Sequence, residues 1–170
     1  MAPASGPAAL EGLEVLDGNA MTDLVSEVLS RGSTAKFVAR GGSMSPWIRD
    51  GDLVTVEPLG SNAPELKTGD VAAFRHPGSG RLRLHRVQAR TNGGWLIQGD
   101  RTGDPDGVIG DALILGRVSA VERGGRIVPL TRGRSSVILA RMSRRALDLR
   151  ALLMRTLRRW RPGLGGGPKP

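Results

Sequence analysis

The feature that most constrains the fold is a series of short apolar runs, each bounded by glycine, proline, aspartate or asparagine. They lie within residues 36–130 and read FVAR, DLVTVE, DVAAFR, RLRLHRVQ, WLIQ, LILGRVSAVE and RIVPL. Runs of this length, separated by residues that favour turns, predict strands joined by tight loops. We therefore expect a mainly β protein, with a compact antiparallel β domain over about residues 36–130.

Local signals predict how this domain begins and turns. Asn92-Gly93-Gly94 and Gly124-Gly125 each separate two of the runs, and such pairs favour tight β-hairpins. Ahead of the first run, Asn19 can cap a short helix that ends near Arg31 and is stopped by Gly32. The β domain with this helix is expected to cover residues 19–130.

The two ends of the chain differ from the β domain in composition. Residues 1–18 are rich in Ala, Pro and Gly, which predicts a disordered leader. In residues 131–161, apolar side chains recur at spacings of three and four with arginines between them. This pattern predicts a long basic amphipathic helix, centred on residues 135–160. The Gly-rich residues 162–170 are expected to form a flexible tail.

The positive charge is concentrated in that C-terminal segment. Of the 25 Lys and Arg residues, 11 lie in residues 131–170 beside a single acid, Asp148, whereas the rest of the chain is nearly balanced. The helix can pack on the β domain or on a second copy, or its arginines can bind an anionic membrane surface. Nucleic-acid binding is less favoured, because the chain has no Tyr and only two Phe for base stacking. The oligomeric state is left open.

Several classes of protein are disfavoured by what the sequence lacks. Without cysteine, the chain has no disulfide, no thiol nucleophile and no thiolate metal site. The first residues carry neither a basic region nor an apolar core typical of a secretory signal peptide. No run of about 18 apolar residues is present to span a bilayer. We therefore expect a cytoplasmic protein, or one bound peripherally at the membrane.

Two stretches offer a nucleophile and a base. Gly41-Gly42 before Ser43 permits backbone angles that can present the serine hydroxyl outward. A serine needs a base to accept its proton. His85 lies in the middle of a predicted strand, whereas His76 lies in a predicted exposed turn. Taken alone, a Gly-Gly-Ser triplet is also typical of a flexible loop. A histidine in a strand likewise often has a purely structural role.

A third stretch, GDRTGDPD over residues 99–106, holds three carboxylates. They could bind a metal, orient an imidazole, or solvate a turn. A calcium loop of the EF-hand type is disfavoured, because the twelfth residue from Asp100 is Asp111 and the flanking segments are predicted strands.

In combination, the order and spacing of SMSPWIRDGDLV, LKTGDVAAF, LHRVQ and IQGDRTGDPD resemble the signal-peptidase family within the S24/S26 superfamily of serine peptidases. The resemblance covers about residues 36–122 and is closest to the branch that uses Ser-His-Asp. The related LexA-type self-cleaving repressors share the fold but use Ser-Lys, and no lysine lies on the strand that would carry that base.

The resemblance implies a role for each motif. Ser43 would be the nucleophile, His85 the base and Asp106 the acid that orients the imidazole. Asp100 would be a supporting hydrogen-bond acceptor or the orienting acid itself. No metal or organic cofactor is implied, and the substrate would be a precursor protein or peptide. Relatives often carry a serine, as a second oxyanion donor, where this chain has Gly41.

One departure from the family concerns the membrane. Signal peptidases are normally anchored by an N-terminal transmembrane helix, which this sequence is not expected to form. Two alternatives to an endopeptidase therefore remain. The first is a non-catalytic domain of the same fold that binds a peptide or a membrane, and the second is a LexA-like regulator with a basic DNA-binding tail.

Overall fold

The computed structural model describes residues 18–60 and 65–130, together with Val137, Ile138 and Met142. A single α-helix, α1, precedes the strands and spans Gly18–Ser30. The strands are β1 (Ala35–Val38), β2 (Leu53–Glu57), β3 (Val71–Arg75), β4 (Leu82–Thr91), β5 (Gly94–Gln98), β6 (Gly107–Ile109), β7 (Ile114–Arg123) and β8 (Arg126–Ile127). A short 3₁₀ turn, Asp111–Leu113, connects β6 to β7.

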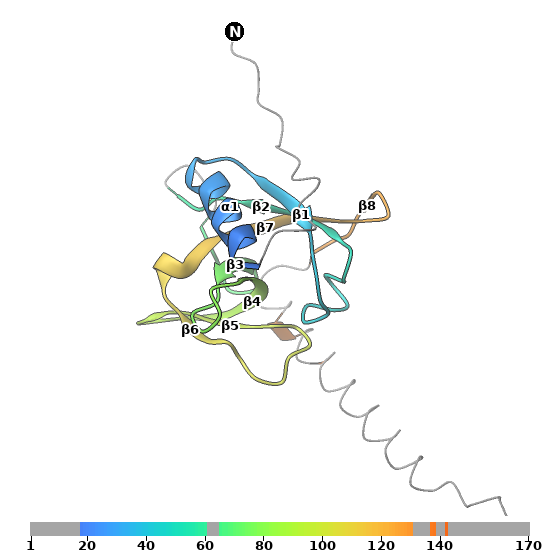
Figure 1. Ribbon diagram of the computed structural model, residues 1–170. Coiled ribbons are helices and arrows are strands. Elements are labelled where there is room, and N and C mark those ends of the chain that lie inside the picture. The colour runs from blue at the N-terminus through green and yellow to red at the C-terminus, as the bar shows by residue number, and fades with distance from the viewer. Residues whose placement is uncertain (1–17, 61–64, 131–136, 139–141, 143–170) are drawn as a thin grey trace, which may run out of the picture.

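All strands join one antiparallel sheet in the order β1-β2-β7-β3-β4-β5-β6, with β8 paired to β7 (Figure 1). The pairing register shifts within three strand pairs, at Thr55/Val56, Ala73/Phe74 and Val87/Ala89. Such shifts bend strands and increase their twist. They allow the two ends of this sheet to curve and bury separate apolar clusters.

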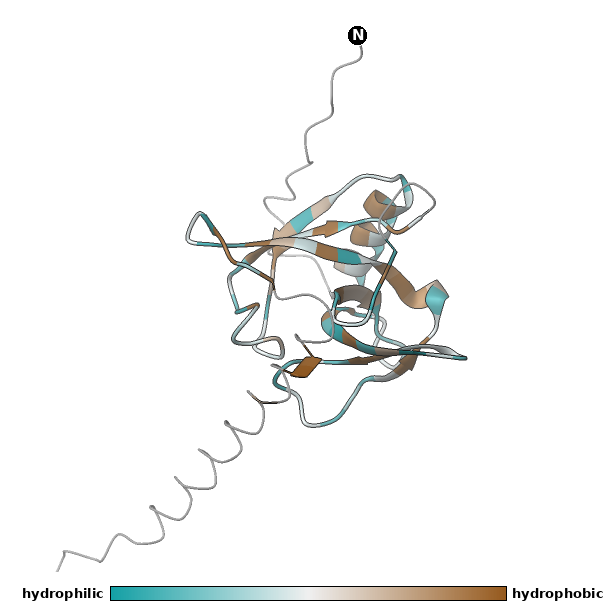
Figure 2. Ribbon diagram, turned by 180° about the vertical axis from the view of Figure 1, so that it is seen from behind, coloured by the Kyte–Doolittle hydropathy of each residue, from teal (hydrophilic) through white to brown (hydrophobic). Residues whose placement is uncertain are grey.

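The first apolar cluster packs α1 against β1, β2 and β7, and includes Val25, Leu29, Val54, Val56 and Val121. The second lies between β3, β4, β5 and β6, and includes Phe74, Val87, Ile97 and Ile109. Figure 2 shows the same division, with apolar segments where α1 and the strands meet and hydrophilic residues at the hairpin tips. The long strands β4 and β7 span the region between these clusters.

The structure confirms the predicted mainly antiparallel β domain with a short N-terminal helix. Both predicted hairpins are present, with two-residue turns at Asn92-Gly93 and Gly124-Gly125. Gly94 has a φ of 137°, and a Cβ there would lie 2.2 Å from the Ile109 carbonyl oxygen, so a side chain at this position is excluded.

Three expectations differ from the structure or fall outside it. β6 was not predicted, and the strand expected over RIVPL is limited to Arg126–Ile127. The leader 1–17, the tail 162–170 and, apart from Val137, Ile138 and Met142, the predicted helix 135–160 lie outside the described residues. Within the described residues, no helix is both long and apolar enough to cross a bilayer.

Candidate active site

Ser43 lies on the connection between β1 and β2, and local hydrogen bonds shape this loop. At its base the backbone of Ala39 pairs with Asp52 and Gly51, at 2.7 and 2.9 Å. Gly41 has a φ of 89°, as the predicted sharp approach to the serine requires, and its N–H donates to the Asp50 carboxylate at 2.7 Å.

Beyond Ser43 the loop is fixed by apolar packing. Met44 and Ile48 are both 3% exposed and belong to the first apolar cluster, and the Ile48 N–H donates to the Met44 carbonyl at 3.0 Å. Because Met44 is buried in the core, Ser43 is held at the edge of the core.

β4 supplies the histidine. His85 pairs in register with Ala72 of β3, and the imidazole is only 4% exposed. Its ring also lies 6.1 Å from the Phe74 ring, in a tilted arrangement. Since β4 is paired to β3 along this whole stretch, the position of the imidazole is set by the sheet rather than by a loop.

The structure brings Ser43, His85 and Asp106 together. His85 Nε2 lies 2.8 Å from Ser43 Oγ, and His85 Nδ1 lies 2.5 Å from Asp106 Oδ2. A carboxylate can only accept, so the proton belongs on Nδ1 and leaves Nε2 to accept from the serine hydroxyl. This is the tautomer that a serine nucleophile requires of its base.

Asp106 follows β5 in the loop that leads into β6. Its N–H donates to the Ile97 carbonyl at 2.9 Å, and Oδ1 accepts from the Arg83 guanidinium at 2.7 Å. Burial opposes ionisation, but the hydrogen bonds and charges of His85 and Arg83 outweigh it and hold the pKa of Asp106 below its usual range. Asp106 is therefore an anion at neutral pH, with each oxygen committed to one partner.

Asp100 does not contact His85. Both oxygens of its carboxylate accept from the Arg86 guanidinium, at 2.8 and 2.6 Å, and both side chains are fully buried. Arg86 also donates to the Gly69 carbonyl at 2.8 Å. Of the two acids left open by the sequence, Asp106 is the one within hydrogen-bond distance of His85.

The buried Arg86–Asp100 pair is linked to the serine through the backbone. The Arg101 N–H, next in sequence to Asp100, donates to the Ser43 carbonyl at 2.7 Å. The loop that Arg86 holds in place therefore holds the serine in turn. Neither Arg83 nor Arg86 was assigned a role from the sequence.

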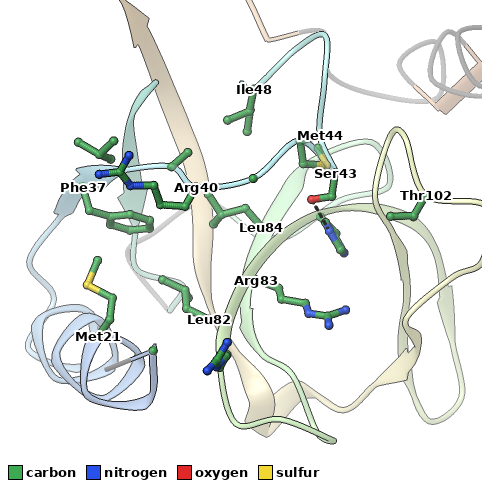
Figure 3. A pocket seen from close by; sticks show the side chains of 16 residues that line it. Met21, Phe37, Arg40, Ser43, Met44, Ile48, Leu82, Arg83, Leu84 and Thr102 are labelled. Carbon is green, nitrogen blue, oxygen red and sulfur yellow. Dashed lines mark hydrogen bonds between the residues drawn. The ribbon is translucent and has the colours of Figure 1, made fainter. Parts of the chain in front are cut away.

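A cleft of about 520 Å³ opens beside Ser43. One wall is formed by residues 37–41 at the end of β1, and the other by residues 81–85 at the start of β4. Figure 3 shows the Ser43 hydroxyl directed at the imidazole near Met44 and Thr102, while Met21 of α1 lies at the opposite end. Ser43 thus lies at one end of the cleft, whose lining includes many apolar side chains.

Both walls present strand edges that pair with no other strand among the described residues. β1 is an edge strand bonded only to β2, and β5 pairs with β4 only from Arg86 onward. On its free side, the first part of β4 bonds α1 once, from the Leu82 N–H to the Thr22 hydroxyl. Such edges can hydrogen-bond an extended peptide laid between them.

The other candidate residues are engaged elsewhere. His76 lies in the turn between β3 and β4, where Nδ1 lies 3.1 Å from the Ser79 hydroxyl. Lys36 forms an ion pair with Glu122 at 2.6 Å. In the part of the chain that the structure describes, no cluster of three or more His, Cys, Asp or Glu side chains is arranged to hold a metal ion.

Comparison with known proteins gives one family. The sequence matches a family model described as Peptidase S24-like over residues 7–119. No curated protein matches the chain. The matched region contains Ser43, His85, Asp100 and Asp106, together with both walls of the cleft.

Proposed function

The chain belongs to the Peptidase S24-like family, and from that membership and the site geometry we propose that it is a serine endopeptidase with Ser43, His85 and Asp106 as its catalytic triad. The observation that carries the proposal is the continuous hydrogen-bonded array from Ser43 Oγ through the imidazole to Asp106 at the end of the cleft. If each of the three side chains had only its own structural role, there would be no reason for them to form one hydrogen-bonded array beside an open groove.

In the first half of the reaction, Ser43 Oγ attacks the carbonyl carbon of a peptide bond while His85 Nε2 takes the hydroxyl proton. Asp106 stabilises the imidazolium that forms. The Ser43 N–H donates no hydrogen bond to any described residue, so it is available to the developing oxyanion. His85 then gives its proton to the leaving amine, and an acyl-enzyme remains.

In the second half, water attacks the acyl-enzyme. His85 takes a proton from the water and returns it to Ser43 Oγ as the ester bond breaks. The products are two peptide fragments, one with a new carboxylate and one with a new amine. No metal or organic cofactor takes part in this sequence of steps.

Within the superfamily we assign the chain to the signal-peptidase type that uses Ser-His-Asp, rather than to the Ser-Lys type. The support is local. His85 Nε2 lies 2.8 Å from Ser43 Oγ, whereas Lys36, the lysine nearest to Ser43 in sequence, is paired with Glu122. We propose a precursor protein or peptide as the substrate, bound in extended form between the free edges of β1 and β4.

The direct test uses a mixture of unstructured peptides incubated with the full chain, with new termini identified by mass spectrometry. We expect cleavage that is lost in Ser43→Ala and in His85→Ala, with a fall in rate of about 10⁴-fold. Ser45→Ala and His76→Gln are the matched controls and should retain cleavage, because neither side chain touches the triad. Equal cleavage by Ser43→Ala and by the unsubstituted chain would refute the proposal.

Binding of residues 135–160 to an anionic membrane remains a separate proposal. It rests on the sequence pattern of apolar residues and arginines, since nearly all of this segment lies outside the described residues. Co-sedimentation with vesicles containing phosphatidylserine, compared with vesicles of phosphatidylcholine alone, tests it. Equal sedimentation with both kinds of vesicle would argue against an electrostatic attachment.

A further inference from the structure

The cleft beside Ser43 has an uneven charge. Three arginines line it, Arg40, Arg81 and Arg83, and no aspartate or glutamate does so among the described residues. Of the two arginines that open β4, Arg83 pairs with Asp106, whereas Arg81 makes no ion pair with any described residue. The described side chains that line the groove are therefore basic rather than acidic, although the described part of the chain carries many acids elsewhere.

Two of the arginines are placed regularly with respect to the base. Arg81, Arg83 and His85 alternate along one face of the extended segment that opens β4, and the antiparallel ladder continues to Arg81 through the His76 N–H at 2.9 Å. Residues two apart on a strand are about 7 Å apart. The guanidinium groups of Arg83 and Arg81 thus come from positions two and four residues before His85 on the same face.

Both side chains remain accessible to a ligand. Arg83 is 41% exposed although it contacts Asp106, and Arg81 is exposed and makes no ion pair with any described residue. The Arg81 side chain lies along the backbone of Gly18, where a Cβ would be only 3.0 Å from its Nε. The start of α1 therefore orients Arg81 along the groove.

We propose that the cleft selects acidic peptides, with carboxylate side chains two and four residues from the scissile bond, on one side of it, paired to Arg83 and Arg81. This inference rests on the proposed function, because it takes the cleaved bond to lie at Ser43. An extended peptide advances by the same repeat as β4, so its alternate side chains keep register with the two arginines. The side chains between them meet the apolar part of the groove, including Phe37 and Leu84.

The groove's chemistry favours a peptide over a nucleic acid as the acidic ligand. Its walls offer unpaired strand edges for a peptide backbone, and the surface between the arginines is apolar. A nucleic acid would instead require cations spaced along its phosphates and rings on which bases can stack.

The test measures binding by fluorescence anisotropy to the full chain carrying Ser43→Ala, which cannot cleave the probe. The probes are labelled eight-residue peptides that alternate alanine with glutamate, glutamine or lysine. At low salt we expect the glutamate peptide to bind about tenfold more tightly than the glutamine peptide, since two partly exposed charge pairs are formed. The preference should shrink as salt is raised.

Matched variants separate the cleft from the general basicity of the chain. In the same background, Arg81→Gln should reduce the tenfold ratio between the affinities for the glutamate and glutamine peptides to about threefold, because it deletes one of the two charge pairs. Arg126→Gln removes an exposed arginine on β8 that does not line the cleft, and should leave the preference unchanged. Arg81→Glu should weaken the glutamate peptide most and favour the lysine peptide.

Equal affinity for the glutamate and glutamine peptides, or no binding of either, would overturn the inference. Equal effects of Arg81→Gln and Arg126→Gln would also overturn it, since binding would then follow overall charge. Failure of the proposed function gives a different result. The glutamate preference and its reduction in Arg81→Gln would persist, but the unsubstituted chain would cleave none of the peptides.

Discussion

His85 and Arg86 are consecutive residues of β4, and each holds a carboxylate, but they do so in different surroundings. The His85–Asp106 pair borders the cleft, with Ser43 on one side and the half-exposed Arg83 on the other. The Arg86–Asp100 pair is fully enclosed. Because side chains alternate along a strand, two neighbouring residues serve a reactive surface and an interior support.

The buried Arg86–Asp100 pair supports the site that contains His85 and Asp106 through the backbone. Arg86 fixes Asp100, and the N–H of Arg101 beside it holds the carbonyl of Ser43 at 2.7 Å. His85 is fixed independently by its pairing with β3. The distance between Ser43 and His85 is therefore set by two separate supports that both involve β4, and each can be removed by its own substitution.

The largest expected effect, on peptide cleavage, comes from removing the negative charge of Asp106 beside His85. Asp106→Asn keeps the shape of the side chain but can no longer stabilise the imidazolium or fix the tautomer. We expect peptide cleavage to fall by about 10⁴-fold. A proton spectrum of the unsubstituted chain should show a strongly deshielded imidazole N–H that is absent in the variant. Retention of full activity by Asp106→Asn would reassign the orienting acid.

The next effect comes from the interior pair. Asp100→Asn leaves the Arg86 guanidinium buried without its counter-charge, so we expect the free energy of unfolding to fall by about 3–5 kcal/mol in urea titrations. The double variant Arg86→Met with Asp100→Leu removes both charges and should recover much of that loss. Its cleavage activity should remain low, because nothing then holds the loop at Arg101 against Ser43. A double variant as unstable as the single one would argue against uncompensated charge as the cause.

A third pair gives an intermediate case with a pH signature. Asp52 ties the Ser43 loop to β7, and its pKa is held below its usual value, chiefly by hydrogen bonds from Arg123, against the opposing effect of burial. Because the folded pKa is lower than the unfolded value of about 3.9, the stabilisation is present above that value and lost as the pH falls through the folded pKa.

Asp52→Asn should accordingly be less stable than the unsubstituted chain near neutral pH, by less than Asp100→Asn. The difference in free energy of unfolding should shrink towards zero in strongly acidic solution. Urea titrations over a pH series measure this difference directly. A difference that persists unchanged to the lowest pH would show that charge on Asp52 is not its source.

The sequence predicted more of the fold than of the site's supports. The mainly β class, the helix before it and both hairpins followed from run lengths and from Asn-Gly and Gly-Gly pairs, which act locally. β6 was missed because Gly107–Ile109 is too short to show a period. Its strand character comes from pairing with β5, which the sequence does not display.

For the site, the resemblance selected Ser43 and His85 but left the choice between Asp100 and Asp106 open. Both acids follow β5 within one loop, and the path of that loop determines which of them reaches the imidazole. Loop paths depend on long-range contacts, here the burial of Arg86 against Asp100. An arginine with no exposed surface is unusual for its type, so its motif alone did not reveal that role.

The smallest expected effect comes from an exposed ion pair that has the same geometry as the buried Arg86–Asp100 pair. Arg90 and Asp111 form a bidentate pair like that of Arg86 and Asp100, and Arg90 also lies 4.6 Å from the centre of the Trp95 ring. Their side chains, however, are 49% and 64% exposed. Water and salt screen an exposed pair and solvate the partner that is left behind when one member is removed.

Arg90→Gln should therefore shift the urea midpoint less than Asp100→Asn or Asp52→Asn, and the shift should diminish further at high salt. Titrations of Arg90→Gln and Asp100→Asn side by side, at low and high salt, compare one geometry in two environments. If the exposed pair costs as much as the buried one, bidentate geometry rather than desolvation governs both. If only the buried pair is costly, and its cost is insensitive to salt, the contribution of Arg86–Asp100 lies in its enclosure, which is also what allows it to fix the loop behind Ser43.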